Sequence, residues 1–246
     1  MKKTETIMAM PVIVDINEPN IDESIFSEIF KYLRYIDDKF STYKNNSEIE
    51  KINRGEISYK EYSNDMKTIL KLSEKTKKET NGYFDIDHNG KLDPSGIVKG
   101  FAIYKASQIL KKKGYKNFYI EIAGDIEISG LNDQNKKWRV GIENPFNRKE
   151  IVKVLELTNK GIATSGKYIR GEHIWNNTKD IVENNVISIT VIADNVYNAD
   201  RFATAAFAMG DKGILFVEKL KNAEGYMVMN NKKAIFTSGF EKYQAA

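Results

Sequence analysis

The stretch NADRFATAAFAMG, residues 198–210, has the composition of a buried helix that ends at a glycine. Asn198 can cap the start of this helix, and Gly210 can terminate it. Two polar side chains, Asp200 and Thr204, interrupt the apolar pattern. Because residues four apart lie on the same face of a helix, the pattern places a carboxylate and a hydroxyl one turn apart beside an apolar surface.

The oxygen atoms of this pair suit a hard cation. A carboxylate, a hydroxyl and a backbone carbonyl form an all-oxygen set, which is the ligand type that Mg²⁺ prefers. Two simpler interpretations compete with a metal site. Asp200 can complement the helix dipole from the first turn, and Thr204 can fill space in the core. The pair by itself leaves these alternatives open.

The rest of the chain mixes helices and strands without a strict β-α-β rhythm, which predicts an α+β fold. We expect further helices over residues 22–40, 58–80, 101–112 and 212–221. We expect strands over residues 10–16, 118–128 around Ala123-Gly124-Asp125, 138–142, 151–157, 186–193, 226–229 and 234–237. A length of 246 residues suits one domain over residues 1–246.

Composition argues against several classes of protein. The sequence contains no cysteine, so we expect no disulfide, no thiolate metal site, no cysteine nucleophile and no cysteine-linked lipid anchor. Hydrophobic residues make up 41% of the chain, which is enough for a core. The net charge of +4 is spread along the chain and forms no basic stripe interleaved with aromatic residues, so we expect no nucleic-acid partner.

The first residues, MKKTETIMAMPVIVDI, lack the apolar block of a secretory signal, because Thr4, Glu5, Thr6 and Pro11 interrupt it. The chain also lacks a run of about 18 apolar residues, the length that crosses a membrane. We therefore expect no membrane insertion and a cytoplasmic protein.

Residues 82–100, GYFDIDHNGKLDPSGIVKG, combine a turn with the start of a helix. Asp93 and the three residues after it favour a turn, and Gly96 allows a close approach of the backbone. Lys99 adds a positive charge near a helix N-terminus, where free amides suit a phosphate group. An ordinary surface turn is the competing interpretation.

Residues 161–175, GIATSGKYIRGEHIW, gather hydroxyls, glycines and charged side chains around His173. The chain has two histidines, His88 and His173. Histidine is the side chain best suited to act as a general base near neutral pH. A histidine with a purely structural role is the alternative.

Taken in order, these stretches resemble the ApbE family of FAD:protein FMN transferases. The resemblance covers nearly the whole chain and rests on six ordered motifs: GYFDI, DPSGIVKGFAI, IAGDIEISG, IATSGKYIRGEHI, ADRFATAAFAMG and IFTSGF. Residues 8–11, MAMP, are similar to the family's opening Met-Gly-Thr strand, and residues 40–53 resemble its Ser-x-Tyr segment. The direct passage from GYFDIDHNG to LDPSG resembles the compact, non-exported branch. The resemblance implies largely antiparallel sheets with packed helices.

The resemblance also implies a reaction. Members of the family bind FAD and Mg²⁺ and transfer FMN to a Thr or Ser hydroxyl of a partner flavoprotein, with release of AMP. Carried over to this sequence, Asp200, Thr204 and the Gly96 carbonyl would hold Mg²⁺. His173 would deprotonate the acceptor hydroxyl. The residues implied to contact FAD are Met8, Tyr43, Asp93, Lys99, Gly124 and Asp125.

The sequence departs from the family pattern at three places. Ala123 stands where the family has the first glycine of Gly-Gly-Asp, and Met10 replaces the usual threonine. After His173 the family usually shows Ile-x-Asp-Pro, whereas this chain reads Ile-Trp-Asn-Asn. Two alternatives to FMN transfer stay open: Mg²⁺-dependent hydrolysis of FAD to FMN and AMP, and FAD binding without turnover.

Overall fold

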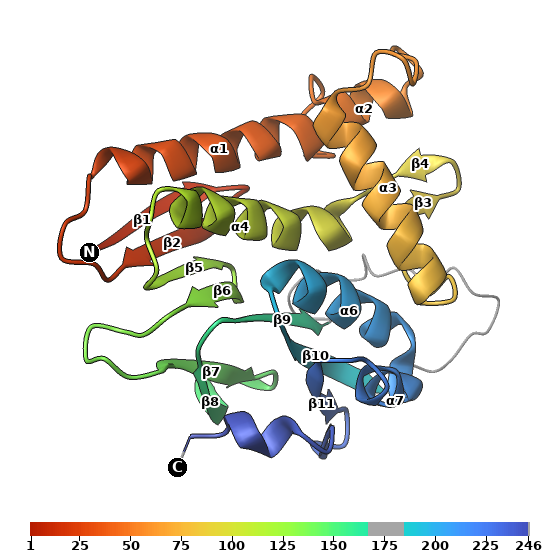
Figure 1. The fold of residues 1–246 in the computed structure, drawn as a ribbon. Helices are drawn as coiled ribbons and strands as arrows, with labels where there is room; N and C mark the ends of the chain where they lie inside the picture. Colours follow the sequence, from red (N-terminus) through yellow and green to blue (C-terminus); the bar gives the residue numbers. More distant parts are fainter. Residues whose placement is uncertain (167–184, 246) are drawn as a thin grey trace.

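The computed structural model describes residues 1–166 and 185–245 (Figure 1). Within these residues an eight-stranded sheet has the order β1-β2-β5-β6-β9-β10-β11-β12, and each neighbouring pair is antiparallel. Its strands are β1 Lys2–Ile7, β2 Met10–Ile16, β5 Phe118–Ile122, β6 Asp125–Ser129, β9 Lys160–Gly166, β10 Val186–Ala193, β11 Glu224–Met229 and β12 Ala234–Phe236. The α+β class and the largely antiparallel sheet are thus confirmed.

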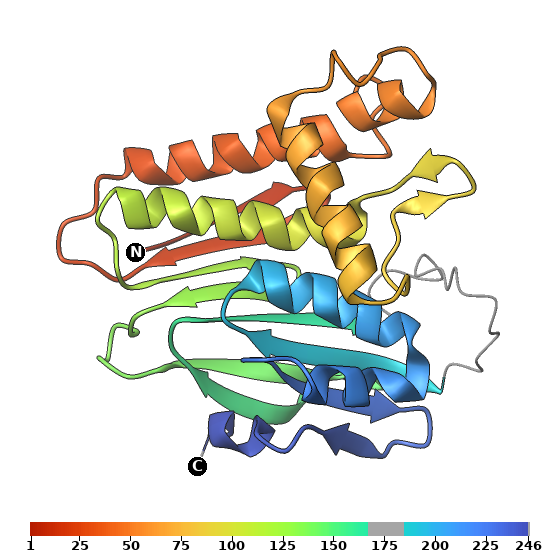
Figure 2. The same ribbon diagram turned by 45° about the vertical axis from the view of Figure 1, so that its right-hand side comes forward.

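Helices cover one face of this sheet (Figures 1 and 2). Helices α4 Ser95–Lys112 and α6 Val196–Ala208 lie against the central strands, and α7 Gly213–Glu218 packs on β11. Helix α1 Ser24–Phe40 lies on α4 and β1. Helices α2 Glu48–Asn53 and α3 Asn64–Glu79 lie farther from the sheet.

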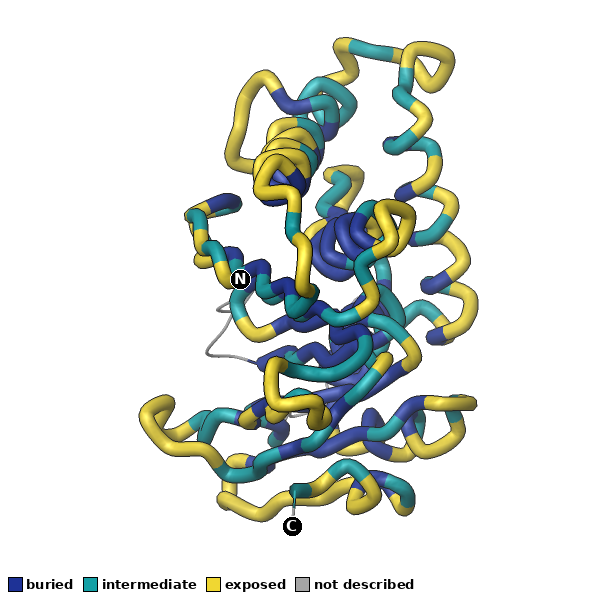
Figure 3. The backbone as a smooth tube through the Cα atoms, turned by 60° about the vertical axis from the view of Figure 1, so that its left-hand side comes forward, coloured by how far each residue is buried: buried dark blue, intermediate teal, exposed yellow. Residues whose placement is uncertain are grey.

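The opposite face is covered by the hairpin of β7 Trp138–Asn144 and β8 Asn147–Leu157, together with the short 3₁₀ segment Phe240–Tyr243. Strand β6 is therefore buried on both faces. Because side chains alternate across a strand, Ile126 and Ile128 pack toward the hairpin, while Asp125 and Glu127 point toward the helices. Figure 3 shows the buried residues gathered in the sheet and in the helices against it.

Several expected elements are confirmed. The strands over residues 10–16 and 186–193 have the predicted bounds. The apolar stripe predicted for residues 22–40 is buried on α1, although the helix begins at Ser24. The Asp22 side chain accepts a hydrogen bond from the Ser24 amide just before that helix.

No helix within the described residues is long and apolar enough to cross a membrane.

The helix starts expected from capping patterns were less accurate. The helix expected over residues 58–80 begins only at Asn64, as α3, where Ser63 caps it; Ser58 and Glu61 bond to each other in the turn before it. Asn195, rather than Asn198, caps α6. Helix α4 begins at Ser95, six residues before the predicted start at 101. Pro94 is its N-cap residue, and the helix continues through Gly96 and Gly100.

Other elements were shorter than expected or were missed. The helix expected over residues 212–221 is a 3₁₀ turn, Gly210–Lys212, followed by the six-residue helix α7. Strands β1 and β9, helix α2 and the small ribbon of β3 Asp87–His88 and β4 Lys91–Leu92 had not been predicted.

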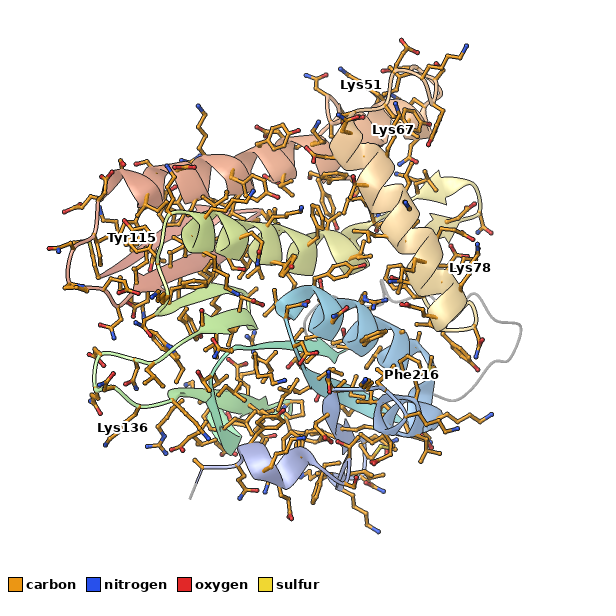
Figure 4. All side chains as sticks on the ribbon, viewed as in Figure 1. Lys51, Lys67, Lys78, Tyr115, Lys136 and Phe216 are labelled. Atoms are coloured by element: carbon orange, nitrogen blue, oxygen red, sulfur yellow. The ribbon has the colours of Figure 1, made fainter. Side chains whose placement is uncertain are left out.

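Some of the lysines that contribute to the positive net charge lie on the helices farthest from the sheet. Lys51 projects from α2, and Lys67 and Lys78 project from α3 (Figure 4).

Candidate functional site

Two tight hairpin turns lie at the same end of the sheet. Met8 and Ala9 join β1 to β2, and Ala123 and Gly124 join β5 to β6; the pairing of β2 with β5 brings the turns together. All four residues have positive φ angles, of 57°, 56°, 47° and 87°. This is the pattern of a type I′ turn, which usually contains Asn and Gly. Strained backbone of this kind is often retained at functional sites.

A cavity of about 560 Å³ opens beside the Met8–Ala9 turn. Its walls come from that turn, from the end of α1 with the segment after it, and from the start of α4. Met8, Tyr43, Asp93 and Lys99 line this cavity, so the structure brings four of the six predicted flavin contacts together. Tyr43 is 87% exposed and leaves its ring free for stacking.

The other two predicted contacts, Gly124 and Asp125, lie outside the lining of this cavity, but Asp125 forms an ion pair with Lys99 of the cavity wall. Asp125 Oδ2 lies 2.8 Å from Lys99 Nζ, and both side chains are buried, at 1% and 7% exposure. Asp125 Oδ1 also accepts a hydrogen bond from the Thr164 amide. The ion pair ties α4 to β6, and it fixes the position of a positive charge at the cavity wall. Gly124 occupies the turn next to Asp125.

The three predicted metal ligands lie on two successive turns of the contact between α4 and α6. Thr204 Oγ1 donates a hydrogen bond of 3.3 Å to the Gly96 carbonyl, and Ser165 Oγ lies 3.5 Å from the same hydroxyl. One turn away, Asp200 Oδ2 accepts a hydrogen bond of 2.8 Å from the Gly100 amide. No group of three or more His, Asp or Glu side chains that could hold a metal ion occurs in the described residues. A metal in this part of the chain would therefore rest on a mixed set of oxygens.

A second buried carboxylate lies behind the site. Glu127 Oε2 accepts a 2.7 Å hydrogen bond from the Val196 amide at the start of α6. Burial raises the pKa of the Glu127 carboxyl to about 7, while the Val196 amide and the nearby Lys111 ammonium oppose the rise. The contact anchors the N-terminal end of α6 to the centre of the sheet.

Sequence reasoning missed Ser165, Glu127 and the part played by Gly100. A signal for Glu127 was present, because polar residues alternate with isoleucines in DIEIS, residues 125–129, as expected for a strand with a polar buried side. Ser165 and Gly100 carried no signal apart from their places in the motifs. His173, the predicted base, lies outside the described residues.

Comparisons with known proteins place the chain in a family. The FAD:protein FMN transferase of Vibrio cholerae is 28% identical over 165 residues, which make up 63% of this chain and 48% of that protein. The chain thus spans about half the length of the curated relatives it matches.

Solved structures and a family model extend the match over the chain. The flavin transferase ApbE from V. cholerae superposes with a TM-score of 0.84 at 22% identity, over 99% of this chain and 98% of that one. The ApbE protein from Thermotoga maritima gives a TM-score of 0.89 at 22% identity, over 100% and 99%. The ApbE family model matches residues 6–90 and 86–227. The chain therefore belongs to the ApbE family.

Proposed function

We propose that this protein transfers FMN from FAD to a Thr or Ser hydroxyl of a partner flavoprotein, with release of AMP and with Mg²⁺ as its cofactor. One observation carries the proposal. Met8, Tyr43, Asp93 and Lys99 line a single cavity, and two residues of its wall, Ser95 and Lys99, directly precede Gly96 and Gly100, which bond to α6.

The cavity suits a dinucleotide. Its volume of about 560 Å³ lies within the range of small-molecule sites, roughly 300–1,000 Å³. The exposed Tyr43 ring offers a stacking surface to an aromatic ring system. The amides at the N-terminal end of α4 suit a pyrophosphate, and the Lys99 ammonium, which pairs with Asp125, adds a donor at the cavity wall.

The residues at the helix contact fit Mg²⁺. A carbonyl, a hydroxyl and a carboxylate supply hard oxygen ligands from Gly96, Thr204 and Asp200, and Mg²⁺ commonly completes such a set with water and phosphate oxygens. A Mg²⁺ ion bound there would neutralise negative charge on the pyrophosphate.

The chemistry balances as a substitution at phosphorus. The acceptor hydroxyl oxygen forms a bond to the phosphorus of the FMN half, the bond from that phosphorus to the bridging oxygen breaks, and AMP leaves with that oxygen. The hydroxyl proton passes to a base, for which His173 stays the prediction. Lys99 offsets charge that builds up on the phosphates.

The cytoplasmic location expected from the sequence also stays a prediction.

The test is AMP release from FAD with Mg²⁺, with and without a Thr-containing flavoprotein domain from the same source. AMP that appears only with the acceptor, together with an acceptor band that fluoresces after denaturing electrophoresis, would support transfer. AMP without acceptor would indicate hydrolysis, with water in place of the hydroxyl. Bound FAD without any AMP would indicate a binding protein and would contradict the proposal.

A further inference from the structure

Helices α4 and α6 run antiparallel and touch along two successive turns (Figure 2). Gly100 lies opposite Asp200, and Gly96 lies opposite Thr204. The first pair is joined by the Gly100 N–H bond to Asp200 Oδ2, and the second by the Thr204 hydroxyl bond to the Gly96 carbonyl. The distance between the two helices therefore decides how the proposed metal ligands are placed.

The absence of a side chain at Gly100 allows α4 and α6 to lie this close together. A Cβ at this position would lie 2.6 Å from Asp200 Cβ and 2.8 Å from the Val196 carbonyl oxygen. Both distances are too short, and the carbonyl belongs to the backbone of α6, so the helix itself would have to move. The contact at Gly96 is less tight, because its Cβ would lie 3.1 Å from Thr204 Cγ2 and 3.2 Å from Phe84 Cε2.

Two further contacts hold these helices to the sheet. Lys99 joins α4 to Asp125 of β6, and Glu127 of β6 holds the Val196 amide of α6. The residues that line the cavity come from α4, from α1 with the segment after it, and from the β1–β2 turn. A small outward shift of α6 would thus change the oxygen set and leave the cavity lining in place.

We propose that Gly100 is a positioning residue that sets the affinity of the site for a divalent cation: its missing side chain lets α6 approach α4, and its N–H orients the Asp200 carboxylate. The inference rests on the proposed function. Mg²⁺ demands nearly ideal octahedral geometry, so a displaced carboxylate weakens binding. Changes to groups that orient metal ligands typically cost roughly 10–100-fold in affinity.

The experiment measures Mn²⁺ binding by electron paramagnetic resonance in the presence of FAD, for the wild-type protein and for Gly100→Ala. We expect the variant to bind Mn²⁺ roughly 10–100-fold more weakly. Its affinity for FAD in EDTA, measured by flavin fluorescence, should stay at the wild-type value. The Mg²⁺ concentration for half-maximal AMP release should rise, and the rate at saturating Mg²⁺ should largely recover.

Gly225→Ala is a control for crowding away from the site. Its Cβ would lie 3.1 Å from Ile214 Cδ1 and 3.1 Å from Val217 Cγ1, which crowds the packing of α7 on β11 and leaves the α4–α6 contact alone. We expect this variant to keep the wild-type affinity for Mn²⁺. A weakening equal to that of Gly100→Ala would mean that general loss of packing explains the effect, and it would overturn the inference.

The remaining outcomes are separable. A folded Gly100→Ala protein with wild-type Mn²⁺ affinity would overturn the role of Gly100 and leave the proposed function intact. Wild-type protein that binds no Mn²⁺ with FAD would refute the metal assignment and this inference with it. If Gly100→Ala does not fold, Gly96→Ala should weaken Mn²⁺ binding, and adding Thr204→Ser should restore part of it by removing the crowded methyl group. If Gly96→Ala binds Mn²⁺ as the wild type does, the proposal that helix spacing sets the affinity is contradicted. It is also contradicted if Thr204→Ser brings no gain in Mn²⁺ affinity when it is added to Gly96→Ala.

Discussion

At the scale of single residues, Asp200 and Thr204 show what a sequence can reveal. Their spacing predicted one helix face, and the structure places both on α6 against α4. Their partners on α4 could not be predicted from spacing, because the Gly96 carbonyl and the Gly100 amide are backbone groups that leave no side-chain signature. The resemblance indicated Gly96, while the part played by Gly100 emerged only from the packing of the two helices.

The charge of Asp200 can be tested without loss of its hydrogen bond. In Asp200→Asn the amide oxygen can still accept from the Gly100 N–H, so the fold should survive, but the negative ligand is gone. We expect Mg²⁺-dependent AMP release to fall by roughly 100-fold or more, since a metal contributes several kcal/mol to such reactions. Circular dichroism checks the fold. Turnover at the wild-type rate would show that Asp200 is not a metal ligand.

The buried pair of Lys99 and Asp125 gives a second prediction, on stability. Lys99→Met leaves the Asp125 carboxylate buried without its cation, so the free energy of unfolding should fall by about 3 kcal/mol. Adding Asp125→Asn removes the buried charge and should restore most of that stability. Both Lys99→Met and the double variant should bind FAD more weakly than the wild-type protein, because the Lys99 ammonium is missing from the cavity wall. Urea unfolding and flavin titration provide the two measurements, and a double variant no more stable than Lys99→Met would contradict the account.

At the scale of helices and strands, the limits of the sequence lie at the ends of elements. Asn195 and Asn198 are equally good caps by type, and Asn195 is used because β10 ends at Ala193 and the chain must turn there. Glu127, which lies 69 residues earlier in the chain on β6, accepts a hydrogen bond from the Val196 amide. Such long-range partners cannot be predicted from local propensity.

Arg201 also links helix α6 to α3. Arg201 is 5% exposed, its guanidinium donates to Glu79 and Thr76, and it lies 3.9 Å from the centre of the Phe202 ring. Replacing Arg201 by Leu removes the bonds and the stacking together, so we expect a loss of roughly 2–4 kcal/mol in the free energy of unfolding.

The partner of this arginine should matter less. Glu79 is 36% exposed at its side chain, so solvent screens the pair, and Glu79→Gln should cost at most about 1 kcal/mol. Urea unfolding of the two variants measures the difference. Equal losses would mean that the ion pair, rather than the burial of Arg201 and its bond to Thr76, fastens α6 to α3.

At the scale of the whole molecule, the site exists because the sheet order gathers distant segments at one end. The turn at Met8 and Ala9, the turn at Ala123 and Gly124 and the start of α4 converge there. Strand order depends on pairings between segments far apart in the chain, such as β6 with β9, and local patterns do not encode them. The motifs predicted candidate flavin contacts, and only the fold shows that four of these candidates share a cavity. The single domain over residues 1–246 stays a prediction.

The stability of the whole molecule should depend on pH through Glu127. Its folded-state pKa of about 7 lies above the usual value of 4.5, because burial disfavours the charged form. The protonated carboxyl therefore favours the folded state: the contribution is complete below pH 4.5 and disappears as pH rises through about 7. A shift of this size corresponds to a few kcal/mol, on the order of 3.

Glu127→Gln keeps an oxygen that can accept from the Val196 amide and removes the titration. We expect the variant and the wild type to be similarly stable near pH 4.5, the usual pKa of the glutamate, and the variant to become relatively more stable as pH rises past about 7. Urea unfolding of both proteins across this interval gives the difference directly, and other titrating groups cancel because both proteins share them. Two curves that run parallel would show that Glu127 has the same pKa folded and unfolded. In that case the carboxylate is held charged by the α6 amide and Lys111, and burial does not control its ionisation.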